Sequence, residues 1–173
     1  MNLKEIYDFR CPRWDDLPDK PIFNKNVVVF INKALSSVVK NEDQLTTNMV
    51  QNYSKWRYIP EITGRKYDRI HVAYLLVISV TKQILNIKDV KEGAQVLLNH
   101  MDEANAYNLF AEALDRSIKR TFESTIKQED YQFQAFEATG RYATVELVTN
   151  AFAMKLLSEM VIESGGYKNL GGN

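Results

Sequence analysis

The segment from about Tyr142 to Ile162 constrains the fold most, because it is apolar on nearly every face of a helix. Its apolar residues recur at three- and four-residue spacing on two sides. One side carries Leu147, Ala151, Met154, Leu157 and Val161, and the other carries Val145, Val148, Phe152, Leu156 and Met160. Such a helix needs a place at the centre of a bundle or against another subunit. We therefore expect an all-α protein and a homodimer formed through its C-terminal helices.

Apolar residues at the same spacing predict further helices along the rest of the chain. The expected helices run from Asn24 or Asn26 to about Val39, from a Thr46 or Thr47 cap to a point before Pro60, from an Asp68 cap to about Leu85, from Ile87 to Leu98, and from Met101 to about Ile126. Three prolines make residues 1–21 an expected irregular arm, with Trp14 and Leu17 as its anchors. Gly165 and Gly166 should end the last helix, and the tail to Asn173 should fray.

The composition restricts the class of protein. Hydrophobic residues make up 45% and charged residues 25% of 173 residues, which excludes disorder of the whole chain. The single cysteine, Cys11, excludes an internal disulfide and a multi-cysteine metal site. The most apolar run, Val72 to Val80, is too short to span a membrane, and residues 1–10 lack the apolar core of a signal peptide. We expect a cytoplasmic protein with a domain at residues 1–98 and a helical domain at 99–173.

Few residues offer catalytic chemistry. There is no glycine-rich phosphate loop and no motif of a serine hydrolase or zinc protease. His71 and His100 are more simply read as polar helix residues than as metal ligands, and Asp15, Asp16 and Asp19 as a solvated acidic loop. Arg10 and Arg13 could lower the pKa of Cys11, yet no base is adjacent to it. The sequence predicts a protein that is not an enzyme and that needs no metal or cofactor.

Charge is distributed unevenly along the chain although the net charge is zero. Residues 46–92 carry 8 basic and 4 acidic side chains, whereas residues 93–173 carry 7 and 11. A basic middle beside an acidic end is typical of a nucleic-acid-binding module joined to a module that does not bind nucleic acid. Ordinary variation in composition gives the same excess, so charge alone leaves both interpretations open.

Three stretches in this basic middle resemble the MerR-type winged helix-turn-helix. They read TTNMVQNYSKWRYIP, GRKYDRIHVAYLLVIS and LNIKDVKEG, and they match a recognition helix ending in a bulky residue and proline, a wing with its helix cap, and the helix after it. The usual glycine before that proline step is replaced by Arg57 and Tyr58. The first helix of the motif is not recognisable, so residues 23–39 would take its place. Together with PRWDDLPDKPI, these stretches resemble a bacterial family known only as a domain of unknown function.

The resemblance implies a small β-wing, at most two strands near Ile62 to Tyr67, and a DNA-binding regulator of bacterial transcription. The expected contacts to double-stranded DNA come from the short helix and the wing, through Thr47, Asn48, Gln51, Asn52, Lys55, Arg65, Lys66 and Tyr67. Amide and hydroxyl groups suit base edges in the major groove, and cations suit phosphates. Tyr53 and Tyr67 could instead simply pack. The alternative function is a helical scaffold that binds a protein or a ligand and no DNA.

Overall fold

The computed structural model describes residues 1–136, 138 and 140–170, with the side chain of residue 141 left out. These residues form a mostly helical protein, and the fold class predicted from the sequence is confirmed at this level. The helices are α1 (Leu3–Tyr7), α2 (Asn24–Ala34), α3 (Thr47–Lys55), α4 (Arg69–Thr81), α5 (Ile87–Leu98), α6 (Glu103–Ile126) and α7 (Ala143–Glu163). Short 3-10 turns lie at Trp14–Asp16, Asn41–Asp43, Gly140–Tyr142 and Tyr167–Asn169. The expectation of a frayed tail after Gly166 is wrong for Tyr167–Asn169, which form one of these turns, and the rest of it at 171–173 lies outside the described residues.

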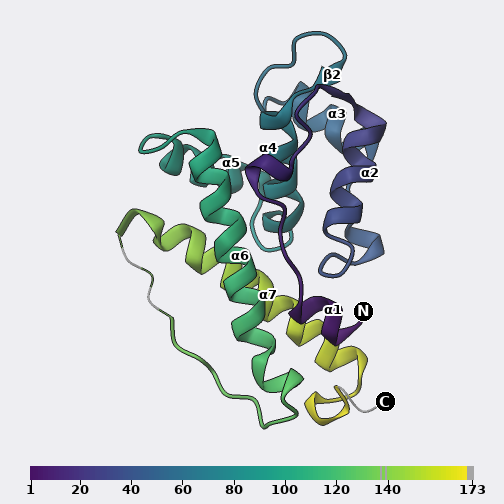
Figure 1. Ribbon diagram of the computed structural model, residues 1–173, viewed down its shortest axis with the longest axis vertical. Coiled ribbons are helices and arrows are strands. Elements are labelled where there is room, and N and C mark those ends of the chain that lie inside the picture. Colours follow the sequence, from purple (N-terminus) through teal and green to yellow (C-terminus); the bar gives the residue numbers. More distant parts are fainter. Residues whose placement is uncertain (137, 139, 171–173) are drawn as a thin grey trace.

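The described strands, β1 (Ile22–Phe23) and β2 (Lys66–Tyr67), form a small antiparallel sheet at one end of the molecule, beside α2 and α3 (Figure 1). Ile22 lies opposite Tyr67, and Phe23 lies opposite Lys66. The expectation of at most two strands is confirmed, and β2 lies in the expected range near Ile62 to Tyr67, but its partner strand lies in the arm that precedes α2 rather than in the wing. A two-residue strand needs a partner and a packed surface in water, and the arm before α2 supplies the partner here.

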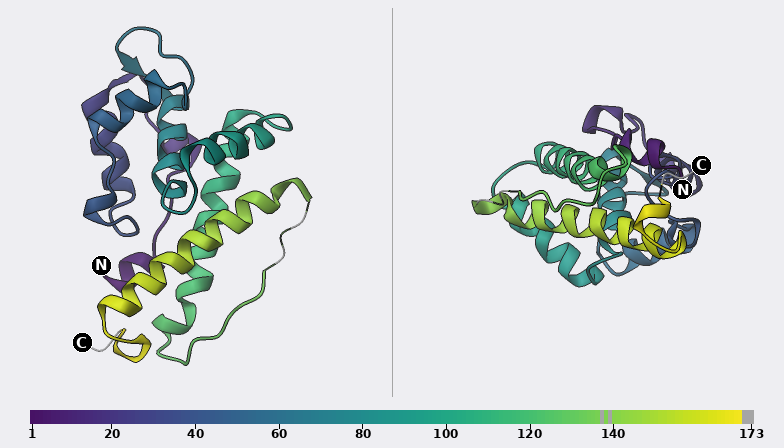
Figure 2. Two further views of the ribbon diagram at one scale, coloured as in Figure 1. Left: turned by 180° about the vertical axis from the view of Figure 1, so that it is seen from behind. Right: turned by 90° about the horizontal axis from the view of Figure 1, so that it is seen from below.

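Two long helices, α6 and α7, cross at the other end of the molecule, and residues 127–136 lead away from the end of α6 along the outside (Figure 2). Ser117 of α6 and Thr149 of α7 are fully buried at the crossing, with their hydroxyl oxygens 2.9 Å apart. Thr149 also donates to the carbonyl of Val145, so this polar pair is satisfied inside the core. Gly165 and Gly166 have positive φ and end α7 as expected.

The arm before α2 is more ordered than the sequence predicts. Residues 3–7 form α1, which packs on α6, and Asn2 caps it by accepting hydrogen bonds from the amides of Lys4 and Glu5. The expectation that residues 1–21 are irregular is therefore wrong for α1 and for the turn at Trp14–Asp16. The prolines at 12, 18 and 21 lie outside both elements, and the turn at Trp14–Asp16 fits between the first two of them.

Side chains of α6 hold the rest of this arm. The amide of Cys11 donates to Asp115 Oδ1 at 2.7 Å, and the guanidinium of Arg13 pairs with Asp115 Oδ2 at 2.6 Å. Asn108 Oδ1 accepts the amide of Trp14, and Leu17 is buried, so both expected anchors contact the body of the protein. Residues 1–17 thus pack on a helix of the predicted second domain.

Two helix boundaries differ from their predictions. α2 ends at Ala34 rather than near Val39, and the hydroxyl of Ser36 donates to the carbonyl of Lys33, which competes with the helical hydrogen bonds. α4 ends at Thr81, and Ile84 is only half-buried against the core. The buried apolar residues form one cluster that runs from Ile6 to Met160. The division at residue 98 therefore stays a prediction. No described helix is long and apolar enough to cross a membrane.

Candidate nucleic-acid interface

The helix α3 presents one continuous polar face. Thr46 caps it, because its hydroxyl accepts the amide of Met49 at 3.2 Å, and Val50 and Tyr53 hold its inner face in the core. Five of the predicted contact residues, Thr47, Asn48, Gln51, Asn52 and Lys55, are exposed on the outer face. Their side chains make no hydrogen bond with any described residue, so their donors and acceptors are available to a partner.

Asparagine side chains of α2 fix the position of α3. Asn24 Nδ2 donates to the carbonyl of Thr47 at 3.1 Å, although the sequence suggested Asn24 as a helix cap. Asn32 Nδ2 donates to the carbonyl of Leu45, and Asn32 Oδ1 accepts the Leu45 amide, both at 2.9 Å. Leu45 is buried directly before α3. The sequence analysis does not predict this role of Asn32. The one sign of it in the sequence is that a polar residue lies among the apolar residues of α2.

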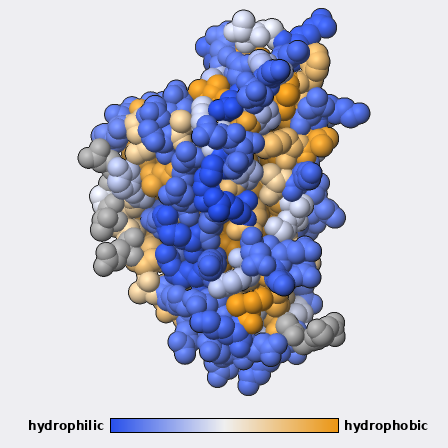
Figure 3. Space-filling view, in the orientation of Figure 1, coloured by the Kyte–Doolittle hydropathy of each residue, from blue (hydrophilic) through white to orange (hydrophobic). Residues whose placement is uncertain are grey.

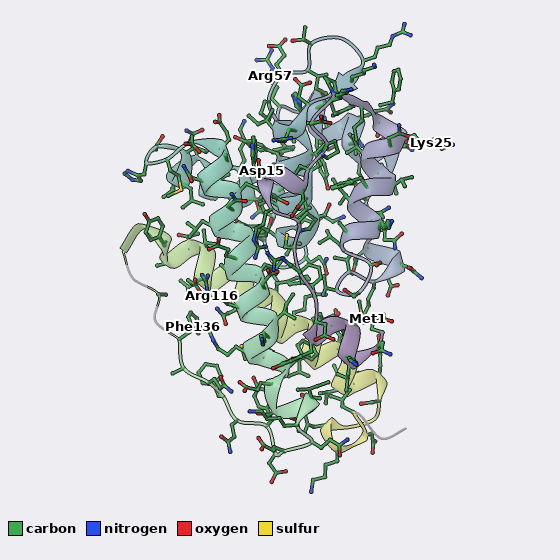
Figure 4. All side chains as sticks on the ribbon, viewed as in Figure 1. Met1, Asp15, Lys25, Arg57, Arg116 and Phe136 are labelled. Atoms are coloured by element: carbon green, nitrogen blue, oxygen red, sulfur yellow. The ribbon has the colours of Figure 1, made fainter. Side chains whose placement is uncertain are left out.

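The end of α3 contains the non-glycine residue that replaces the usual glycine. Arg57 has φ of 57°, the left-handed conformation that glycine adopts without strain. The amide of Tyr58 donates to the carbonyl of Tyr53 at 2.8 Å, and the amide of Arg57 donates to that of Ser54 at 3.0 Å. This is a Schellman helix end with arginine at its left-handed position. The Arg57 side chain projects from the same end of the molecule as β2 (Figure 4).

The segment 61–67 turns at Gly64, where φ is 88°, and places Arg65 and Lys66 in solvent. The ammonium of Lys66 lies 5.0 Å from the centre of the Phe23 ring, and that ring is itself 53% exposed. Tyr67 differs from the other predicted contacts, because only 6% of it is exposed and its burial raises the pKa of its hydroxyl. The structure therefore favours packing for Tyr67, since alternate residues of a strand face opposite sides and Lys66 faces outward.

A buried histidine joins this segment to α4. His71 Nδ1 accepts the amide of Asp68, and Nε2 lies 3.3 Å from the carbonyl of Glu61, to which it donates. Asp68 and His71 thus form a reciprocal cap at the start of α4, as the sequence predicted for Asp68. His71 is 3% exposed, so the interpretation of a surface residue is wrong, and its role is to hold both ends of the segment 61–67 together.

Cations without acidic partners surround α3. Lys25, Lys55, Arg57, Arg65 and Lys66 are exposed, and no described carboxylate lies within ion-pair distance of any of them. Some basic residues elsewhere pair with acids, as Arg69 does with Asp15 and Arg116 with Glu146, whereas others, such as Lys4 and Lys168, have no ion pair with a described residue either. In Figure 3 the end of the molecule that carries β2 shows hydrophilic side chains with small apolar patches between them. Unpaired cations around a polar helix can neutralise phosphates without losing an existing ion pair.

The remaining candidates from the sequence do not assemble into a reactive site. Burial, followed by the charge of Asp115, raises the pKa of Cys11 to about 12, so the expectation that neighbouring arginines lower it is wrong. Asp15, at 95% side-chain exposure, is in solvent and pairs with Arg69. Among the described residues, no group of three or more His, Cys, Asp or Glu side chains is placed to hold a metal ion.

Comparison with known proteins places the chain in a family. No curated protein and no solved structure matches it. A family model described as a domain of unknown function, DUF1836, matches residues 12–115, which include the second half of the arm, α2 to α5 and the first half of α6. Because this match covers more than half of the sequence, the chain belongs to the DUF1836 family.

Proposed function

We propose that this protein binds double-stranded DNA and regulates transcription in the manner of bacterial MerR-type proteins. The observation that carries the proposal is the exposed face of α3, whose amides, hydroxyls and Lys55 have no partner among the described residues. An α-helix fits the major groove, where such groups distinguish bases. In this proposal α2 takes the place of the first helix of the motif, and residues 64–66 act as the wing.

Two features support the assignment of roles. Asn48, Gln51 and Asn52 carry the groups that read adenine and other base edges, whereas Arg57, Arg65 and Lys66 carry charge that suits the phosphate backbone. The connection between α2 and α3 spans residues 35–46 and is longer than the short turn of an ordinary helix-turn-helix. Asn32 compensates for this length, because its two hydrogen bonds to Leu45 hold the end of the connection against α2.

Duplex binding tests the proposal directly. Titration of the full chain with random duplex DNA at increasing salt should give binding that weakens with salt, and an Arg65→Ala/Lys66→Ala double variant should bind all duplexes more weakly with a salt slope lowered by about two. The matched control is Lys4→Ala/Lys168→Ala, since both lysines are exposed and lie far from α3 at the end near the termini. Equal slopes for the two variants would remove the wing from the proposal.

Gln51→Ala tests base reading rather than phosphate binding. It should reduce the difference in affinity between preferred and random duplexes, with little change in the salt slope. Absence of duplex binding by the wild-type chain at low salt would favour the alternative, a helical interaction or ligand-binding scaffold.

We also propose that the protein is a homodimer through α7. Leu147, Met154 and Ile162 are 56%, 39% and 78% exposed along one side of this helix. The exposed positions between them, Ala151 and Ser158, are uncharged, so the stripe carries no charge that a partner would have to desolvate. The side of α7 that faces away from this stripe packs against α6 and α4 of the same chain. A two-fold pair would bury the stripe and present two α3 helices to a palindromic site.

A further inference from the structure

A partly open cavity of about 110 Å³ lies between α4 and α5 on one side and α6 and α7 on the other. Its walls come from α4, α5, α6 and the first turns of α7, and the residue that follows Arg57, Tyr58, also lines it. Most lining side chains are apolar, among them Val77, Ile78, Leu97, Phe110, Val145 and Val148. A concave site with apolar walls and a few polar groups at its mouth is the usual form of a small-molecule site.

We propose that this cavity binds a small uncharged organic molecule of about one ring, with at most one hydroxyl group. The size follows from the volume, because an apolar cavity of about 150 Å³ accommodates benzene. The lack of charge follows from the walls, because a charged group placed among these side chains would lose its hydration without a partner.

The polar residues that line the cavity define which ligand fits. They include Asp89, Glu103 and Tyr74, and the carboxylate of Asp89 already accepts a hydrogen bond from Asn86 Nδ2. Neither the Tyr74 hydroxyl nor the Glu103 carboxylate makes a hydrogen bond with a described residue, so one donor and one acceptor are available to a ligand hydroxyl. Lys91 is the single cation among the lining residues, and two carboxylates outweigh it. The site therefore disfavours anions and accepts a phenol-like molecule.

Small residues leave this space open. Ala73, Gly93, Ala94 and Ala106 all line the cavity. A Cβ atom added to Gly93 would meet only the Cγ2 atom of Thr144, at 3.9 Å, which is ordinary contact. Alanine would fit there and would favour the helix over glycine. The chain thus carries a residue that weakens α5 at the point where it widens the cavity.

Occupancy of the cavity has a direct route to α3. Tyr58 lines the cavity, and its ring lies 6.4 Å from that of Tyr53 and 6.3 Å from that of Trp56, both at the end of α3. A ligand that contacts Tyr58 can therefore shift the position of its ring and, through Tyr53 and Trp56, the C-terminal end of α3, where Arg57 lies. This last step rests on the proposed DNA binding, whereas ligand binding itself does not.

The test uses the full chain without DNA and three probes of similar size: toluene, p-cresol and benzoate. Toluene and p-cresol at millimolar concentration should raise the melting temperature and shift the methyl NMR signals of Ala73, Ala106 and Val145, with p-cresol binding more tightly. Benzoate should do neither. Absence of any shift with both neutral probes, or equal binding of benzoate, overturns the proposal.

A cavity-filling variant locates the site. Ala94→Met should keep or raise the melting temperature and weaken p-cresol binding about tenfold or more, whereas Ala104→Met, on α6 outside the cavity, should leave it unchanged. Unchanged p-cresol binding by a folded Ala94→Met variant overturns the proposal. If Ala94→Met does not fold, NMR shifts confined to the three wall methyl groups of the wild-type chain decide the matter, and shifts elsewhere count against the cavity.

Repeating the duplex titration with and without p-cresol then tests the route through Tyr58. A changed duplex affinity supports the coupling between the cavity and α3. An unchanged affinity excludes that coupling and leaves the proposal of a ligand site unaffected. If the protein binds no duplex at all, the proposed function fails, and the DNA-free measurements still decide the ligand site.

Discussion

The amide of Tyr58 donates a 2.8 Å hydrogen bond to the carbonyl of Tyr53, and the left-handed Arg57 lies in the turn between them. The same arrangement ends α6, where Glu129 bonds back to Ser124 across Gln128, which has φ of 58°. The two turns differ in their surroundings, because only Arg57 lies beside the exposed face of α3. Substitutions at Arg57 and Gln128 can therefore distinguish the effect of backbone strain on stability from the effect of a positive charge on duplex binding.

Arg57→Gly should raise the free energy of unfolding by up to about 1 kcal/mol, because glycine relieves the left-handed strain at a smaller entropic cost. It should also weaken duplex binding and lower the salt slope by about one, because one cation is lost. Gln128→Gly should stabilise the fold to a similar degree and leave duplex binding unchanged. Denaturant unfolding and salt titration measure the two effects, and equal duplex affinity of both variants would exclude a role for Arg57.

Leu76→Ala should lower the free energy of unfolding by about 2–5 kcal/mol, because Leu76 is fully buried in α4 and its loss leaves a cavity. Val29→Ala on α2 is the control, since Val29 is 59% exposed and its truncation should change stability by no more than about 0.5 kcal/mol. Urea unfolding of the two variants measures both. A loss below about 1 kcal/mol for Leu76→Ala would contradict the packing of α4 described above.

The protein should lose stability as the pH rises above the ordinary pKa of a thiol, 9.0, towards the raised pKa of Cys11 at about 12. In this window the unfolded chain releases the thiol proton and the folded chain keeps it, so unfolding is favoured by about 1.4 kcal/mol per pH unit. Burial also raises the pKa of Tyr107, and this contribution has the same sign. Cys11→Ala should therefore reduce, without abolishing, the loss of stability measured between pH 9 and pH 11.

The native thiol of Cys11 should also react slowly with a thiol-specific reagent at pH 8, because the buried group stays protonated. Unfolding in denaturant should restore the rate of an ordinary cysteine. Rapid modification of the folded protein would show that the arm opens readily from α6.

The mass in solution should be about twice 20.0 kDa by light scattering at micromolar concentration. Leu147→Glu and Met154→Glu should lower it towards the monomer, because each places a carboxylate in the proposed α7 interface. Val29→Glu, an exposed apolar position on α2, should leave the mass unchanged. A wild-type mass near 20.0 kDa would exclude the dimer. Leu157 is unsuitable for this test. The sequence places it on the same side of α7 as Leu147 and Met154, but it is only 6% exposed and packs within its own chain.

Local sequence determined most helices and several of their ends, because caps and apolar spacing act over a few residues. Thr46, Asp68 and Asn86 begin α3, α4 and α5 through their own side chains, and each is recognisable in the sequence. The exposed polar face of α3 follows from the same periodicity, since Val50 and Tyr53 define its buried side. The five predicted contact residues on α3, Thr47, Asn48, Gln51, Asn52 and Lys55, are therefore exposed as the spacing predicts, and so are Arg65 and Lys66, which the resemblance to a wing predicted.

Tertiary structure decided the features that depend on residues far apart in the chain. The pairing of β2 with β1, the inward position of Tyr67 and the cavity between α4 and α7 all arise from contacts between separate elements. Asp115 lies 102 residues from Arg13, and no local sequence pattern predicts that its carboxylate accepts hydrogen bonds from Arg13 and from the amide of Cys11 and so holds the arm on α6. Helix propensity and capping are local energies that a short stretch of sequence contains, whereas burial and long-range hydrogen bonds exist only once the elements have packed together.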